Sequence, residues 1–488
     1  QRFDRGQMTW DGTIGYANLL SENTGLSKGD RMRGDLFGTA EYDLDNVWRA
    51  GLNVNYVSDK SYLELYNTGS ATQLTNRAYI EGFEGRDYAA VNGYYFQDLR
   101  PGTQPVQPIV LPEAEFDLLG EPGQALGGRW SLDGSSLMTA RDNSAAPGYE
   151  QGPDTRRLSL DAGWQRQLIS DTGLLTNVQG LVRGDGYWAD HVPNPNNPDS
   201  SFNNVLIGRQ FEQANATFSY PFGRTGDGYQ QILEPIVMLT AAPVVHTDPR
   251  QPIEDSQDIE FNYTNLFSPN RFTGTDLIEG GSRATYGIRN SIVGDNGARL
   301  EVFGGQSYDF TPDNLFPYLS GLRDQMSDYV GYISASPGPW LETDYGFRLD
   351  HNNGVPQEQD AHVSFGAPVF RPFVRYLSAY ETDTTGLVDF VKEGTLGFSS
   401  NFAKYYNVTA EHIQAFTPAP GPRTTAVSLN YEDECMVFGV TVLQNYTSRI
   451  DVSSGTSVVF HLYLKNAGGI RTDSFTTPTY ATQFRQTD

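Results

Sequence analysis

The chain has a single cysteine, Cys435, so it cannot form a disulfide bond within itself. It also lacks any apolar run approaching the roughly 18 residues of a membrane-spanning helix; the longest candidate begins at Ile236 and ends before Thr240. These two absences exclude an internally disulfide-bonded scaffold and a helical membrane protein. They do not exclude a transmembrane β-barrel, because each of its strands needs only about ten alternating residues.

Basic residues are also scarce: 34 lysines and arginines stand against 59 acidic residues, for a net charge of −25. A nucleic-acid-binding surface needs a basic face, so we predict no nucleic-acid partner. The six histidines are scattered without the paired spacing of a metal site, and no glycine-rich phosphate loop leads into a helix. We therefore expect no metal, no cofactor and no catalytic residues.

The chain does contain a repeated alternation of apolar and polar residues with a period of two. The stretch 47–57 alternates in this way, and the stretch 341–350 does so again. Such a strand places its apolar side chains on one face and its polar side chains on the other. The apolar face of the first stretch consists of Trp48, Ala50, Leu52, Val54 and Tyr56.

Strand-like segments recur along the whole chain, joined by tight turns that alternate with long polar loops. No linker and no internal repeat divides them. An open sheet of this size would expose two edges, whereas closure into a ring removes them. We therefore predict an all-β fold: a large antiparallel transmembrane β-barrel of about 20–26 strands, forming a single domain over residues 1–488. The polar start, Gln1–Trp10, lacks a signal sequence and indicates a fragment of a longer protein.

Closure assigns a direction to each face, because the wide interior must hold water or a plug and the exterior must contact lipid. Aromatic residues near strand ends are expected to form girdles at the membrane surfaces. We expect charged residues to face inward, namely Asp161, Glu301, Glu342, Asp344 and Arg348. We expect apolar residues to face lipid, namely Leu160, Trp164, Leu300, Val302, Tyr345, Val440, Val442 and Leu462. The expected girdle residues are Trp48, Tyr56, Trp164, Tyr187, Trp188, Tyr329 and Tyr446.

One long loop combines acidic and aromatic residues, over 254–270. It either folds into the interior as a partial lid or stays exposed, and both alternatives remain open at this point. Its acidic residues, Asp255, Asp258 and Glu260, are of a type that binds divalent cations. The candidate lumen-loop residues are Asp255, Asp258, Asn262, Asn265 and Phe267.

An ordered set of short motifs resembles the LptD family, the lipopolysaccharide-assembly proteins of the Gram-negative outer membrane. Each motif is weak alone, but together they cover nearly the whole chain in the right order. The motifs are Val47-Trp48-Arg49, Ser58-Asp59, Ser61-Tyr62, Leu233-Glu234-Pro235, Asn265-Leu266-Phe267, Glu279-Gly280-Gly281, Tyr286-Gly287, Gly305-Gln306-Ser307-Tyr308, Tyr431-Glu432-Asp433-Glu434-Cys435 and the last strand Val458–Leu464.

The resemblance implies a translocon that inserts lipopolysaccharide into the outer leaflet through its lumen and a lateral gate. It also implies a plug lipoprotein of the LptE type in the lumen. A periplasmic bridge protein of the LptA type would deliver the lipid to an N-terminal β-jellyroll domain. The gate would lie between the first and last strands, with Val458, Phe460, Leu462 and Leu464 on the gate-side last strand.

This sequence departs from the family pattern in three ways. The jellyroll is absent, the match begins inside the barrel, so that the first strands are expected to be missing, and Cys435 is followed by Met436 where family members commonly carry two adjacent cysteines. The resemblance implies at most one interdomain disulfide from Cys435, and a free thiol is the alternative. Two other classes remain: a passive outer-membrane porin or channel, and a secreted all-β adhesin or enzyme.

Overall fold

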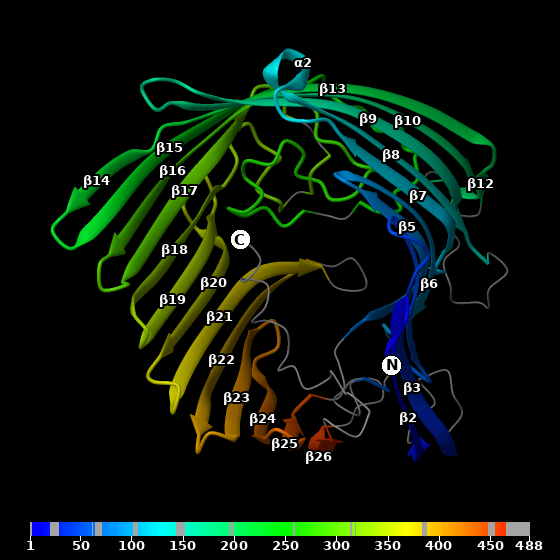
Figure 1. Cartoon of the computed structure of the whole chain (residues 1–488), viewed down its shortest axis with the longest axis vertical. Coiled ribbons are helices and arrows are strands. Elements are labelled where there is room, and N and C mark those ends of the chain that lie inside the picture. The colour runs from blue at the N-terminus through cyan, green and yellow to red at the C-terminus, as the bar shows by residue number, and fades with distance from the viewer. Residues whose placement is uncertain are drawn as a thin grey trace.

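A computed structural model shows one large antiparallel sheet of 24 strands, which confirms the predicted fold class. It describes residues 2–464 except 20–28, 61, 64–70, 101–105, 143–151, 195–196, 198–199, 257–258, 313–314, 318, 383–387 and 448–453. The strands pair in chain order and run round the molecule from β2 to β26 (Figure 1). No helix in this described part is long and apolar enough to cross a membrane.

Most strands of the first half have ten or more residues, and one short helix-like turn lies between two of them. They are β1 (Arg2–Phe3), β2 (Gly6–Leu19), β3 (Gly29–Asp43), β4 (Trp48–Val57), β5 (Gln73–Glu84), β6 (Asp87–Asp98), β7 (Ile109–Leu119), α2 (Gln124–Gly127), β8 (Arg129–Ala140), β9 (Asp154–Ile169), β10 (Leu175–Asp190), β11 (Val192–Pro193), β12 (Ser201–Phe202), β13 (Val205–Ser219) and β14 (Phe222–Gly226). Strands β11 and β12 form a separate two-stranded sheet.

The second half continues the same meander. Its strands are β15 (Tyr229–Ala241), β16 (Arg283–Gly294), β17 (Arg299–Asp309), β18 (Tyr329–Gly338), β19 (Leu341–Leu349), β20 (Pro356–Phe365), β21 (Arg371–Thr382), β22 (Val388–Phe402), β23 (Tyr406–Thr417), β24 (Gly421–Glu432), β25 (Met436–Asn445) and β26 (Gly455–Leu464).

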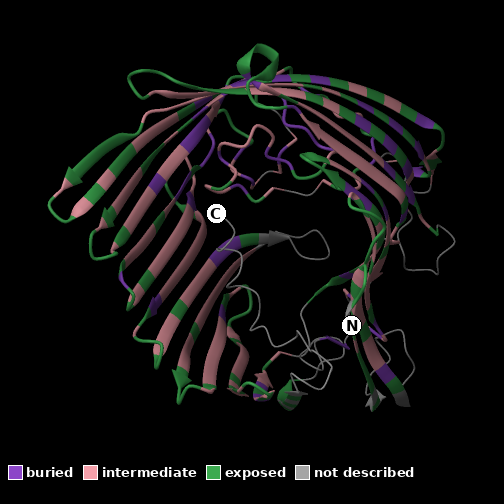
Figure 2. Ribbon diagram, viewed as in Figure 1, coloured by how far each residue is buried: buried purple, intermediate pink, exposed green. Residues whose placement is uncertain are grey.

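Exposure alternates along the strands, as the period of two predicts (Figure 2). On β9, Leu158 and Leu160 are 67% and 49% exposed, while Arg157 and Ser159, which alternate with them, are buried. A strand in a curled sheet turns successive side chains to opposite faces, and here the apolar set lies outside. The predicted outward direction of Leu160 and inward direction of Asp161, which contacts the inward-facing Arg183, are therefore confirmed on this strand.

One of the expected girdle residues faces the other way. Trp188 is exposed on the outer face, but its neighbour Tyr187 is buried on the inner face, where its hydroxyl accepts a hydrogen bond from Arg209 Nη2 at 3.1 Å. Adjacent residues of a strand cannot share a face. The prediction for Tyr187 was therefore wrong, and the alternation itself forbids placing both residues in one girdle.

The connections lie at two rims of different character. Tight turns such as 170–174 and 295–298 lie at one end of the strands, and long connections such as 242–282 lie at the other. Barrels of the outer membrane have short periplasmic turns and longer external loops. Cys435 is exposed in one of the short turns, between β24 and β25.

Two features of the ladder position the functional region. Strand β13 pairs with β15 only over Ala214–Ser219, because β15 ends at Ala241 and the chain then leaves the wall. At the ends of the sheet, β1 pairs with β2 and β26 pairs with β25, and among the described strands no pairing joins β26 to β1 or β2.

Candidate functional site: the inner loop and the arginine row

Two long connections fold against the inner face of the sheet (Figure 1). The inner loop, residues 242–282, joins β15 to β16 and is described apart from 257–258. The companion loop, residues 310–328, joins β17 to β18 and is described apart from 313–314 and 318. Their contacts with inward-facing side chains show that the inner loop lies inside the curled sheet.

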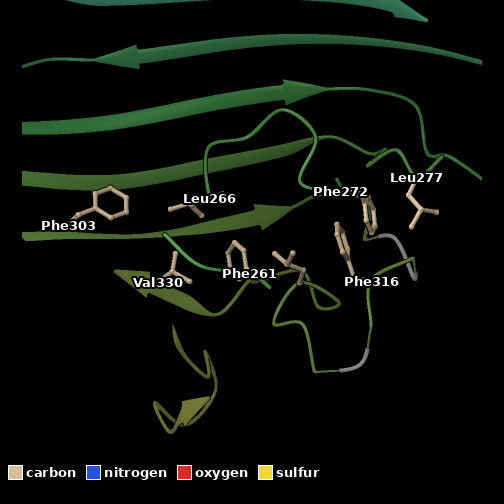
Figure 3. Close-up of a cluster of buried hydrophobic side chains, with 8 residues drawn as sticks. Phe261, Leu266, Phe272, Leu277, Phe303, Phe316 and Val330 are labelled. Carbon is tan, nitrogen blue, oxygen red and sulfur yellow. The ribbon is translucent and has the colours of Figure 1, made fainter. Parts of the chain in front are cut away.

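An apolar cluster holds the two loops together and attaches them to the wall (Figure 3). The rings of Phe272 in the inner loop and Phe316 in the companion loop stack with their centroids 4.7 Å apart. Burying a side chain of this size contributes roughly 1.5–3 kcal/mol. The cluster consists of Phe261, Leu266, Phe272, Leu277, Phe303, Phe316, Leu322 and Val330.

A glycine in the wall allows the loop to approach this closely. A Cβ atom on Gly305 of β17 would lie 2.5 Å from a methyl carbon of Leu266 and 2.8 Å from the carbonyl oxygen of Tyr286. Leu266 is fully buried against this position. The family-like motif around Gly305 thus has a packing reason, since any side chain here would displace the inner loop.

A buried carboxylate between two guanidiniums forms the base of the inner loop. The Glu279 carboxylate contacts Arg271 and lies 3.2 Å from Nη1 of Arg283, and all three side chains are almost completely buried. Burial would by itself raise the pKa of Glu279, but the two positive charges outweigh it and lower this pKa below the ordinary value. Arg271 also lies over the rings of Phe261 and Phe316 at 5.5 Å.

The two glycines after Glu279 let the ends of the inner loop cross. A Cβ atom on Gly280 would lie 2.6 Å from both the Pro243 carbonyl oxygen and the Val245 amide nitrogen. Gly281 has φ of +83°, in the left-handed region that glycine enters without cost, and its N–H donates to the Pro243 carbonyl at 2.9 Å. The motif Glu279-Gly280-Gly281 is thus a loop closure and an ion-pair anchor.

Four arginines on neighbouring strands point inward beneath the inner loop, and we call them the arginine row. Arg141 directly follows β8, Arg157 lies on β9, Arg183 on β10 and Arg209 on β13. Their side chains are 12%, 4%, 10% and 8% exposed, respectively. Four cations at this degree of burial require anionic or carbonyl partners.

Carboxylates of the inner loop supply the partners of the first two arginines. Glu254 binds Arg141 in a bidentate pair, with N–O distances of 2.6 and 3.0 Å. Arg157 bonds Asp276 at 2.7 Å and Asp255 at 2.9 Å. Bidentate and charge-assisted bonds of this kind are the strong ones.

The other two arginines bind both the wall and the loop. Asp185 on β10 accepts from Arg183 at 2.9 Å and from Arg209 at 2.7 Å. Both guanidiniums also donate to the carbonyl oxygen of Thr275, at 2.7 and 3.0 Å, and Arg209 donates to that of Asp276. The backbone of the inner loop therefore lies directly on the row.

The two loop carboxylates above Arg157 titrate differently. Burial opposes the charge of Asp255, but the contact with Arg157 and the N–H of Thr275 outweigh it and lower its pKa to about 2. Asp276 is more deeply buried, and burial raises its pKa despite Arg157. Each carboxylate also accepts from backbone N–H groups of the segment opposite it. Asp276 accepts from the N–H groups of Glu254 and Asp255, and Asp255 accepts from those of Thr275 and Asp276.

The candidate lumen-loop residues serve different purposes. Asp255 contacts the row. Asn262 and Asn265 close a turn, in which Asn262 Oδ1 accepts from the N–H of Thr264 and Asn265 Oδ1 accepts from the N–H of Asn262, each at 3.0 Å. Phe267 packs on the apolar cluster, and Asp258 lies outside the described residues.

The divalent-cation site expected at Asp255, Asp258 and Glu260 stays a prediction, because Asp258 lies outside the described residues. In the described part of the loop, no group of three or more acidic, histidine or cysteine side chains could hold a metal ion. The Asp255 carboxylate is instead engaged by Arg157 and by backbone N–H groups.

The candidate gate residues lie on the last strand of the sheet, and the three whose side chains are described lie on its outer face. Val458, Phe460 and Leu462 of β26 are 51%, 66% and 60% exposed, and the backbone of Leu464 pairs with Met436 of β25. Sequence reasoning missed the arginine row. A signal was present, because these arginines share the inward parity of four neighbouring strands.

A large, curled antiparallel sheet with an apolar exterior and loops folded against a charged interior defines a β-barrel protein of the outer membrane. Residues 31–405 match the sequence profile of the LptD family, LPS transport system D. The LPS-assembly protein LptD of Thiobacillus denitrificans is 24% identical over 91% of this chain and 58% of its own length. That of Acinetobacter baumannii is 23% identical over 90% of this chain and 54% of its own length. That of Pseudomonas entomophila is 33% identical over 48% of this chain and 26% of its own length.

Solved structures with a similar course of the chain include the copper transporter OprC. It covers 95% of this chain with 10% identity and a TM-score of 0.40. The siderophore receptor PirA from Acinetobacter baumannii covers 93% with 8% identity and a TM-score of 0.36.

The profile match covers most of the chain, and the chain therefore belongs to the LptD family, as the sequence motifs predicted. Its place is the outer membrane of a Gram-negative bacterium. The chain spans about half the length of the relatives it matches most fully.

Proposed function

We propose that this chain is the barrel of a translocon that inserts lipopolysaccharide into the outer leaflet of the outer membrane. The observation that carries the proposal is the match to the LptD family over residues 31–405, on a sheet with an apolar exterior and a charged interior. Lipopolysaccharide has a polar sugar part and apolar acyl chains. A wall of this kind offers water to the first and lipid to the second, and no covalent chemistry is needed.

To place its acyl chains in the membrane, such an amphiphile must pass sideways through the wall, between two strands. The two strands must be poorly paired, because a fully paired ladder resists opening. The ends of the sheet, at β2 and β26, are the natural place, since no pairing between them is found in the described part of the chain. In this proposal β26, which carries Val458, Phe460, Leu462 and Leu464, is the last-strand side of the gate.

The partners proposed here follow the family pattern. A plug lipoprotein of the LptE type would occupy the part of the lumen that the inner loop leaves free. A bridge protein of the LptA type would deliver the lipid from the periplasm through an N-terminal domain. Cys435 is exposed in a short turn, on the rim that faces the periplasm in such barrels, and we propose it as the barrel half of an interdomain disulfide.

Photo-crosslinking in cells tests the gate directly. A photoreactive amino acid at Phe460, on β26, is expected to capture lipopolysaccharide, whereas the same group at the outward-facing Leu396 of β22 serves as the control. Both side chains are similarly exposed, at 66% and 62%. Equal capture at the two positions would contradict a gate at the end of the sheet.

Depletion separates the translocon from a passive pore, the alternative that the family match does not favour. Loss of surface lipopolysaccharide on depletion supports the translocon. Unchanged surface lipopolysaccharide with lower permeability to small solutes would support the pore. Co-purification of a lipoprotein with the barrel provides a second and independent test.

A further inference from the structure

The arginine row is a built site rather than a scatter of charges. Its four guanidiniums come from adjacent strands, and the side chain of Arg157, which is 4% exposed, keeps its Nε atom without a hydrogen-bond partner. The strands that carry the row are paired along most of their length, so its geometry is fixed by the wall. The inner loop, in contrast, is attached mainly by side chains.

The charge balance of the row depends on the inner loop. The wall supplies two carboxylates, Asp161 and Asp185, and both contact Arg183. The four guanidiniums of the row and the two wall carboxylates together carry a net charge of +2. The inner loop adds Glu254 and the pair above Arg157, three carboxylates in all, and this changes the net charge to −1. Among the described residues, the guanidiniums of Arg141 and Arg157 form ion pairs only with carboxylates of the inner loop.

The loop groups resemble the anions that such a row would bind. The bidentate pair of Arg141 with Glu254 has the fork geometry in which guanidinium binds carboxylate and phosphate alike. Above Arg183 and Arg209 the loop offers backbone carbonyl oxygens. An extended chain of sugars that carries phosphate groups presents the same kinds of acceptor.

We propose that the arginine row binds the phosphate groups on the sugar part of the cargo, and that the inner loop occupies the row as an internal substitute until the cargo displaces it. This inference rests on the proposed function and names the part of the cargo that the interior recognises. The loop would thereby keep a basic interior closed while no cargo is present.

A binding measurement on the complete protein in detergent tests this. Glu254→Gln/Asp255→Asn/Asp276→Asn removes the substitute charges, and Asp248→Asn, which breaks an exposed pair in the same loop, is the matched control. The probes are deacylated, phosphorylated lipopolysaccharide oligosaccharide, the same oligosaccharide after phosphatase treatment, and inorganic phosphate. Gel mobility with and without heating reports the folded barrel.

The triple variant is expected to bind the phosphorylated oligosaccharide at least about tenfold more tightly than the wild type, the least that one charge-assisted bond provides. Adding Arg141→Gln/Arg157→Gln should cancel the gain, and salt should weaken binding. A gain for inorganic phosphate alone would assign the row to free phosphate and overturn the proposal. So would an equal gain after phosphatase treatment or with Asp248→Asn.

A second measurement does not require the triple variant to fold. A spin label at Ile253→Cys, in a Cys435→Ser background, is expected to become mobile when the phosphorylated oligosaccharide is added and to stay immobile after phosphatase treatment. Immobility with both probes overturns the proposal. Surface lipopolysaccharide in depleted and complemented cells is measured in parallel. If surface lipopolysaccharide depends on this protein while the row shows no phosphate preference, only the present inference fails. If surface lipopolysaccharide does not depend on this protein, the proposed function fails.

Discussion

Nη1 of Arg157, on the inner face of β9, lies 2.7 Å from Oδ1 of Asp276 in the inner loop, and the two side chains are 4% and 1% exposed. They are separated by 119 positions in the sequence. This contact joins the wall of the barrel to a loop that contributes nothing to the ladder. The position of the loop therefore depends on a small number of charged contacts together with two apolar clusters, the one around Phe272 and a second in which Val245 and Ile278 of the loop pack on Phe211 of β13.

Arg157→Met should release the neighbouring part of the inner loop. Breaking a buried ion pair by removing one partner costs about 3–5 kcal/mol, because the remaining charge is left buried without compensation. Spin-label mobility at Ile253→Cys in increasing urea measures the docking of the loop, again in a Cys435→Ser background.

The control for this change is Arg250→Met, which removes an exposed pair with Asp248 in the same loop. Exposed pairs contribute little to stability, because water and salt screen them. Equal urea midpoints for the two variants would show that the Arg157 contact does not hold the loop.

Acid should loosen the inner loop only well below neutrality. The pKa values of Asp255 and Glu279 are lowered in the folded protein, the first to about 2. Such groups stabilise the docked loop at pH values above their unfolded pKa, and this contribution is lost as the pH falls through the folded pKa. Asp276 has a raised pKa, so its protonation on acidification has the opposite sign and favours docking.

Spin-label mobility is therefore expected to stay constant from pH 7 to about pH 4, the unfolded range of carboxylic acids, and to rise below it. Glu279→Gln should remove part of this acid response. Release of the loop between pH 7 and pH 5 would contradict the assignment, because neither lowered group protonates there.

Gly280→Ala should disturb the crossing of the two ends of the inner loop. The added Cβ would meet backbone atoms of Pro243 and Val245 at 2.6 Å, and backbone cannot rotate away as a side chain can. Overpacking of this kind costs about 1–3 kcal/mol. Protease sensitivity of the inner loop in the folded barrel is the measurement.

Gly297→Ala, in the tight turn between β16 and β17, is a useful comparison. Its φ is +83°, in the left-handed region, and the space around it is open. Its cost is conformational and remote from the inner loop, so the protease sensitivity of that loop should not change. If both substitutions expose the loop equally, the close approach at Gly280 is not what matters.

The alternation of the strands could be predicted from the sequence, because a strand has only two faces. One face of each strand contacts lipid and the other contacts the aqueous interior. The error at Tyr187 arose from counting aromatic residues near a strand end without applying that parity to Trp188. The inner loop has no period, so its fold could not be predicted. Its ion pairs with the arginine row join residues more than 90 positions apart, such as Arg141 and Glu254, and only the register of the whole sheet brings them together.

The apolar outer face predicts a sharp difference between neighbours on one strand. Leu396 on β22 is 62% exposed on the outer face, and Thr395 precedes it on the inner face. An arginine on the lipid face of a barrel costs about 2–4 kcal/mol at the bilayer midplane, whereas interior positions tolerate polar substitution. Leu396→Arg should therefore lower the yield of folded barrel in liposomes, and Thr395→Arg should lower it much less, although the new arginine would lie opposite Arg375.

Folding yield is read from gel mobility without heating. Equal losses for the two variants would mean that this part of β22 does not face lipid, and the assignment of the outer face would then fail at its most exposed leucine in the second half of the sheet.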